Sequence, residues 1–255
     1  MRIGFFGDIH GRVEKFHHVL QKAIETSQIS VAIQVGDFGI SKKVVKKLDA
    51  LGGFPVPVHF IDGNHEDFRF LWKAMKKGII EEWENKNLYF QPRGSTLVVQ
   101  GTNIGFFGGA LHVGRPQKII KGNVITTDEV NRAVFEFSRF SPDIMITHSC
   151  PAGIGIGMQG LEIHYWGVVN HIVLAGFNPG PKADCGETQH TLLWNQMLQR
   201  PKLWVYGHFH EQKITEVEDT TFVSLSCLER YHDSVIWDTD DEALLLIPRG
   251  DCSSN

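Results

Sequence analysis

Short apolar runs alternate with helix-like spacing in the first third of the chain. Runs of strand length lie at residues 1–6, 31–35 and 56–61. Between and after them, apolar residues recur every three or four positions over residues 12–27, 42–51 and 68–75, which predicts amphipathic helices. Ser41 is the expected N-cap of the second helix because its side chain can accept from a free N–H group. This strand–helix order predicts parallel strands with helices packed on the sheet.

The remainder of the chain is richer in strands. A hairpin is expected from residues 97–99 and 103–107, and further strands at 143–147 and 202–206. Thr127 is the expected cap of a helix with Val130, Val134 and Phe137 on one face, and residues 188–199 read as another helix. The last four apolar runs, at 213–217, 221–225, 234–237 and 243–247, predict a meander of strands. Nothing between them resembles a linker, so we expect one domain over residues 1–247 and a frayed tail over 248–255.

Composition and charge narrow the class of protein. With 42% hydrophobic and 21% charged residues in 255, the chain fits an ordinary globular protein with a sizeable core. Its net charge of −4 argues against a dedicated nucleic-acid binder. The four cysteines form no CxxC pair, which favours free thiols over structural zinc. The first apolar run is too short for a signal peptide or membrane span, so a cytoplasmic location without membrane contact is expected.

Polar, glycine-rich segments follow five of the predicted strands. They read GDIHG at 7–11, GDFG at 36–39, GNHE at 63–66, a single His148, and GHFH at 207–210. Loops at the carboxyl ends of parallel strands meet at one edge of a sheet, where α/β proteins bind ligands. We therefore expect the five segments to converge, although they are far apart in sequence.

The residue types in these segments are those of a metal site. The candidate ligands are Asp8, His10, Asp37, Asn64, His148, His208 and His210. Carboxylate, imidazole and amide donors suit divalent Mn, Fe, Zn, Ni or Co. The alternation in Asp8-x-His10 and His208-x-His210 would turn both members of each pair to one side of an extended segment. Two ions in such a site can clamp a phosphoryl group and activate water.

As a set and in their order, these motifs resemble the calcineurin-like metallophosphoesterase superfamily. The resemblance implies a four-layer α/β/β/α sandwich of two mixed sheets flanked by helices. It implies one metal held by Asp8, His10 and His210, a second held by Asn64, His148 and His208, and Asp37 bridging them. Manganese is the first choice of metal, and a hydroxide between the ions would attack phosphorus. His65 would face the substrate and protonate the leaving group.

Departures from the family pattern narrow the branch. Ser/Thr protein phosphatases carry an arginine shortly after the second motif, whereas this chain reads GDFGIS there. They usually lack the histidine at the position of His210. Both differences favour a phosphodiesterase-like branch, so a hydrolase of phosphodiesters or phosphomonoesters is expected. The lack of a basic excess favours a small nucleotide-like phosphoester as substrate. A Ser/Thr protein phosphatase, a DNA or RNA nuclease and a non-catalytic scaffold stay as alternatives, although no ligand position is missing, which speaks against the scaffold.

Substrate contacts are expected at the rim of the site. Arg12 follows the first motif and either pairs with a phosphate oxygen or faces solvent at a helix start. Arg115 lies soon after a glycine pair that follows a strand and is a second candidate. The segment 149–187 follows His148 and contains Tyr165 and Trp166, so it is expected to overhang the site. The lysine pairs at 42–43 and 46–47 are expected to form a solvated helix face.

Overall fold

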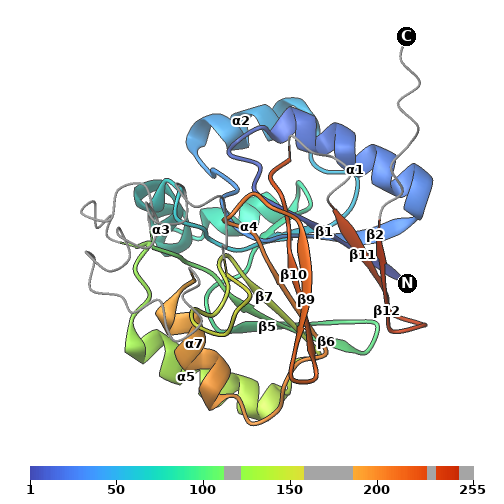
Figure 1. Cartoon of the computed structure of the whole chain (residues 1–255). Coiled ribbons are helices and arrows are strands. Elements are labelled where there is room, and N and C mark those ends of the chain that lie inside the picture. The colour runs from blue at the N-terminus through green and yellow to red at the C-terminus, as the bar shows by residue number, and fades with distance from the viewer. Residues whose placement is uncertain (112–121, 158–185, 229–233, 247–255) are drawn as a thin grey trace, which may run out of the picture.

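Two six-stranded sheets pack face to face between two layers of helices (Figure 1). The computed structural model of the chain describes residues 1–111, 122–157, 186–228 and 234–246. In sheet order, the first sheet consists of β12 (Ala243–Leu246), β11 (Val235–Asp238), β1 (Arg2–Phe6), β2 (Ile29–Gln34), β3 (Val58–Phe60) and β4 (Leu88–Phe90). The second consists of β5 (Ser95–Val99), β6 (Thr102–Phe107), β7 (Ile144–Thr147), β8 (Leu203–Tyr206), β10 (Thr220–Ser224) and β9 (Lys213–Val217). Each sheet is mixed. In the first sheet, β1 to β4 are parallel and β11 and β12 add antiparallel pairs at one edge, whereas the second sheet has a parallel centre and an antiparallel strand at each edge.

The described helices cover the outer faces of the two sheets. Those beside the first sheet are α1 (Val13–Ser27), α2 (Lys42–Ala50), α3 (Phe68–Lys76) and α4 (Ile79–Glu84). Those beside the second sheet are α5 (Thr127–Phe140) and α7 (Thr188–Gln196). Among the described residues, none of the helices combines the length and apolar character needed to cross a membrane.

Strand alternation divides the core into three apolar layers. In β1, Ile3 and Phe5 point between the sheets, whereas Phe6 packs against the helices. The layer under α5 and α7 includes Trp194 and Trp204, whose ring centroids lie 5.7 Å apart. Because both faces of each sheet centre are covered, these strands are continuous apolar runs rather than alternating ones. The predicted four-layer fold is confirmed.

Several predicted elements need correction. Thr126, not Thr127, is the N-cap of α5, because its side chain and Glu129 form a reciprocal capping box. Helix α7 ends at Gln196 rather than at residue 199, and Leu198 beyond it is 80% exposed, so no apolar burial supports a further turn. Helix α4 and strand β4 were not predicted, since each is short and has little periodicity.

The predicted C-terminal meander is wrong. Strands β9 and β10 pair in the second sheet, and β10 continues it by lying parallel to β8. Strands β11 and β12 instead pair in the first sheet, where β11 is antiparallel to β1. The last strands therefore complete both sheets, since each sheet has an edge strand position that only the C-terminal part fills.

Candidate metal centre

The five polar segments converge at one end of the sandwich, but they come from both sheets. Three follow β1, β2 and β3 of the first sheet, and two follow β7 and β8 of the second. Hydrogen bonds join the two sets, including His148 Nδ1 to the carbonyl oxygen of Val35 at 2.9 Å and the His208 N–H to Asp8 Oδ1 at 3.2 Å. The expectation of convergence holds, and the site lies where the two sheets meet rather than along one sheet edge.

One group of side chains gathers around Asp8. Its Oδ2 lies 3.0 Å from His210 Nε2 and 3.9 Å from His10 Nε2, and the two histidine nitrogens are 3.2 Å apart. Asp8 is fully buried, while the His10 and His210 side chains are 29% and 46% exposed. Three potential ligand atoms therefore face one another at the surface end of the site, in a group able to hold a metal ion.

A second group gathers around Asp37 and is buried more deeply. Asp37 Oδ1 lies 3.4 Å from His148 Nε2, which is 3.1 Å from Asn64 Oδ1. The rings of His148 and His208 meet edge to face with centroids 5.0 Å apart. Asp8, Asp37 and His148 also lie close enough together to bind one ion. The seven side chains predicted as ligands thus occupy one continuous cluster.

The backbone that presents these side chains is not extended, which corrects the expectation from alternation. His10, Asp37, His208 and His210 have φ values of 46°, 52°, 72° and 56°. The left-handed region costs roughly 1–2 kcal/mol for a residue with a Cβ. Such conformations persist only where the surrounding structure imposes them, and they cluster at functional sites. The side chains converge because tight left-handed turns follow the strands.

Glycines at two places leave the space that the cluster needs. A Cβ at Gly36 would lie 2.4 Å from His148 Nδ1, and one at Gly63 would lie 2.1 Å from Asp37 Oδ1. Both distances are far below van der Waals contact. The glycines in the second and third segments therefore permit His148 and Asp37 to approach the neighbouring backbone.

The electrostatics of the cluster call for a cation. The Val35 carbonyl accepts a hydrogen bond from His148 Nδ1, so Nε2 is the nitrogen that faces the oxygens of Asn64 and Asp37. Burial disfavours a charged ring, but Asp37 outweighs it and raises the pKa of His148 to about 10. Burial likewise opposes ionisation of Asp37, yet His148 holds the pKa of that carboxyl below its ordinary value. A bound divalent ion would supply the positive charge that the buried Asp37 carboxylate requires, and the carboxylate, imidazole and amide donors are suitable ligands for such an ion.

The sequence matches the model of a known protein family over the residues that form this cluster. The family model described as calcineurin-like phosphoesterase matches residues 1–212, which include all five segments. The chain belongs to the calcineurin-like phosphoesterase family. This family is one of phosphoesterases, and the described residues include groups that could hold a metal ion.

Individual relatives of this calcineurin-like phosphoesterase are distant. The lariat debranching enzyme of Saccharomyces cerevisiae is 23% identical over 254 residues, covering 86% of this chain and 59% of that enzyme. The chain therefore spans less than two thirds of that relative. The crystal structure of TT1561 from Thermus thermophilus has a TM-score of 0.58 at 13% identity and covers 95% of this chain and 96% of that one. The structural likeness shows the fold.

His65 lies at the open side of the cluster. Its backbone N–H donates to Asp37 Oδ1 at 2.7 Å, and its ring packs edge to face against His10 with centroids 5.4 Å apart. His65 is exposed whereas Asn64 beside it is buried. This placement separates a solvent-facing imidazole from the buried ligand candidates.

Of the two predicted substrate-binding arginines, only Arg12 lies among the described residues. Arg12 is the N-cap residue of α1 and donates from Nε to the carbonyl oxygen of Ile9, at 3.1 Å, within the first segment. It lies beside the cluster and is partly buried, so its role at the substrate stays a prediction. Arg115, and Tyr165 and Trp166 of the predicted overhang, lie outside the described residues.

Two buried polar residues that hold the loops together were missed. Gln34 donates from Nε2 to the carbonyl oxygens of Gly7, at 3.1 Å, and Gly36, so it ties the first segment to the second. Glu66 Oε2 accepts from the Ile40 N–H at 2.7 Å and ties the third segment to the second. Burial and the charge of Asp37 raise the pKa of Glu66 to about 8. A glutamine inside the apolar run 31–35 was the signal that could have revealed the first of these.

Proposed function

We propose that the chain hydrolyses phosphodiesters of small nucleotide-like molecules at a dinuclear metal centre. The proposed ligands of one ion are Asp8, His10 and His210, those of the other are Asn64, His148 and His208, and Asp37 is shared. Manganese is the proposed metal, and the donor set equally suits iron, zinc, nickel or cobalt. The chemistry supplied by two bound divalent ions is polarisation of phosphoryl oxygens and activation of a water nucleophile.

The position of Asp37 carries this proposal. Its two oxygens face different groups, since Oδ1 lies 3.4 Å from His148 Nε2 and Oδ2 lies 3.9 Å from His10 Nδ1. Asp37 therefore contacts both groups, as a shared ligand would, and Asp8 belongs to both groups as well. The His65 N–H holds Oδ1 in that orientation.

The chain's own residues supply the proton chemistry. His65 is exposed beside the cluster and anchored by its backbone to Asp37. An imidazole can carry a proton near neutral pH, and protonation of the leaving oxygen contributes about 10²–10⁴-fold to rates in general. We assign His65 this role, and Arg12 the role of binding a phosphate oxygen.

A diester is preferred to a phosphoprotein as substrate for two reasons. No arginine follows Asp37 before α2 begins at Lys42, so a guanidinium typical of protein phosphatases is absent from that loop. The exposed His210 adds a ligand candidate at the open side of the cluster. An RNA diester is the second candidate, because the relative that is similar over 86% of this chain is a lariat debranching enzyme.

A substrate panel separates these possibilities. The manganese-loaded protein is assayed against bis(p-nitrophenyl) phosphate, p-nitrophenyl phosphate, a phosphoserine peptide, dinucleotides, cyclic nucleotides and a branched RNA. We expect the diesters to be hydrolysed faster than the monoester and the phosphopeptide. The Asp37→Asn variant serves as the inactive form, and Asp67→Asn, at the N-cap of α3, is the matched control that keeps activity.

The outcomes lead to different functions. Preference for the phosphopeptide would contradict the proposal and favour a protein phosphatase. Turnover confined to the branched RNA would favour the second candidate. Full metal content without turnover on any phosphoester would favour a non-catalytic scaffold.

A further inference from the structure

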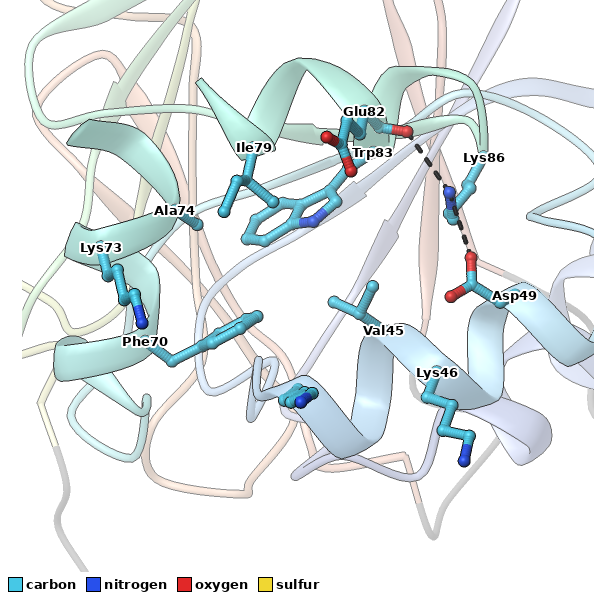
Figure 2. Close-up of a pocket in the computed structure, with 11 residues that line it drawn as sticks. Val45, Lys46, Asp49, Phe70, Lys73, Ala74, Ile79, Glu82, Trp83 and Lys86 are labelled. Atoms are coloured by element: carbon cyan, nitrogen blue, oxygen red, sulfur yellow. Dashed lines mark hydrogen bonds and ion pairs between the residues drawn. The ribbon is translucent and has the colours of Figure 1, made fainter. Parts of the chain in front are cut away.

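A hollow of about 470 Å³ lies among α2, α3 and α4, on the helical layer outside the first sheet (Figure 2). None of its lining residues belongs to the candidate metal centre. Its volume is within the range of about 300–1,000 Å³ of small-molecule sites. The size therefore suits a single small ligand.

The floor of the hollow is apolar and aromatic. Phe70 of α3 and Trp83 of α4 lie nearly parallel, with ring centroids 6.0 Å apart and an interplanar angle of 19°. Val45 and Ile79 point into the same space from α2 and α4 (Figure 2). A flat apolar body could pack against these side chains.

The rim of the hollow is basic. Lys42, Lys46 and Lys73 line it and are exposed, and none of the three forms an ion pair within the described part of the chain. Lys86 is engaged with Asp49 at 3.1 Å. Glu82 also lines the hollow, so four lysines and two carboxylates lie around it and positive charge is in local excess, although the chain as a whole has a net charge of −4. Such a rim is complementary to an anion such as a phosphate.

The floor of the hollow contains a buried hydrogen-bond donor, the indole N–H of Trp83, that has no acceptor among the described residues. The Trp83 side chain is 1% exposed, and its Nε1–H has no hydrogen-bond partner among the described residues. The ring nitrogen lies on the side of the indole that faces Val45 (Figure 2). A buried donor without a partner destabilises the fold. A ligand with an acceptor in its flat body would remove this cost.

We propose that this hollow binds a free mononucleotide. The base would pack on Phe70 and Trp83 and accept from the indole N–H, while the phosphate would meet Lys42, Lys46 and Lys73. An alkyl carboxylate lacks the acceptor within its apolar body, and inorganic phosphate lacks the body. A nucleotide combines the three features. This site is independent of the proposed hydrolysis, since it shares no residue with the metal cluster.

Calorimetric titration tests the proposal with the manganese-loaded full chain and adenosine monophosphate, uridine monophosphate or inorganic phosphate. The double variant Lys46→Ala/Lys73→Ala should weaken nucleotide binding at least about tenfold, because hydrogen bonds to charged groups are strong. Trp83→Phe should weaken it about fivefold by removing the donor while keeping an aromatic ring. The matched control is Lys43→Ala/Lys76→Ala, which removes one lysine from each of the same helices outside the hollow and should bind as wild type. Binding should also persist in Asp37→Asn.

Several results would overturn the proposal. One is equal affinity of the Lys46→Ala/Lys73→Ala variant and the wild type for the mononucleotides. Because both lysines are exposed, this variant should fold, so it tests the proposal even if Trp83→Phe unfolds. Inorganic phosphate binding as tightly as the nucleotide is another. Binding of an oligonucleotide without binding of either mononucleotide would assign the hollow to a nucleic-acid strand instead.

Discussion

At the scale of single residues, the site depends on where two buried carboxylates point. Asp8 faces His10 and His210, whereas Asp37 offers one oxygen to each histidine group. Both carboxylates are almost fully buried and their ion-pair partners are imidazoles. Such a cluster gains more from a bound cation than from any single side chain.

Replacing Asp37 by asparagine should remove both metals and abolish turnover. The substitution keeps the size of the side chain but removes the charge that faces both groups. Loss of a residue that only orients a ligand typically costs about 10–100-fold in metal affinity, so the loss of a shared ligand should exceed this. Metal content by elemental analysis measures the effect, and full occupancy in the variant would show that Asp37 does not bridge.

Replacing His65 by asparagine should separate binding from turnover. Its ring is not among the proposed ligands, so metal content should stay that of wild type. Loss of a general acid should lower kcat by about 10²–10⁴-fold. The effect should shrink for a diester with a good leaving group such as p-nitrophenolate, which needs less protonation. An equal loss for good and poor leaving groups would argue against a proton-donor role.

At the scale of elements, the tight turns after the strands position the ligands. Gly63 allows the third segment to pass against Asp37, where a Cβ would come within 2.1 Å of Oδ1. Gly63→Ala should therefore displace Asp37 and lose metal as Asp37→Asn does. Gly52→Ala is the control, since the space there is open although φ is +76°. It should cost about 1–2 kcal/mol of stability and leave the metal content unchanged, so metal loss in both variants would assign the effect to general destabilisation.

The sequence predicts helices and strands that have a local apolar pattern. It does not predict which strands pair when they are far apart in the chain. Strands β1 and β2 were predicted because each is a continuous apolar run. Helix α1 was predicted because its apolar residues recur every three or four positions. The division of β9 to β12 between two sheets could not be predicted, since β11 pairs with β1 at the other end of the chain. The ligand types were readable from sequence. The left-handed turns at His10 and His208 were not, because they are imposed by contacts between loops.

At the scale of the whole molecule, stability should depend on pH through buried histidines. Burial, with the charges of Arg93 and His148, lowers the pKa of His190 to about 3. The ordinary value in the unfolded chain is about 6.5. Between these values the unfolded chain binds a proton that the folded chain does not. The stabilising contribution is therefore complete above pH 6.5 and is lost as pH falls toward 3.

The His190→Leu variant tests this dependence. Between pH 7.5 and 5, wild type should lose about 2 kcal/mol more unfolding free energy than the variant. Urea unfolding at the two pH values gives the difference. Parallel losses in both proteins would mean that His190 does not remain neutral in the fold.

The central claim is that loops from two sheets form one centre that needs two metal ions to hydrolyse a phosphodiester. The most direct test is to titrate metal-free protein with manganese while measuring hydrolysis of bis(p-nitrophenyl) phosphate. The geometry around Asp37 predicts that activity rises until two equivalents per chain are bound and then stays constant. Full activity at one equivalent, or activity that is independent of metal, would contradict a dinuclear centre.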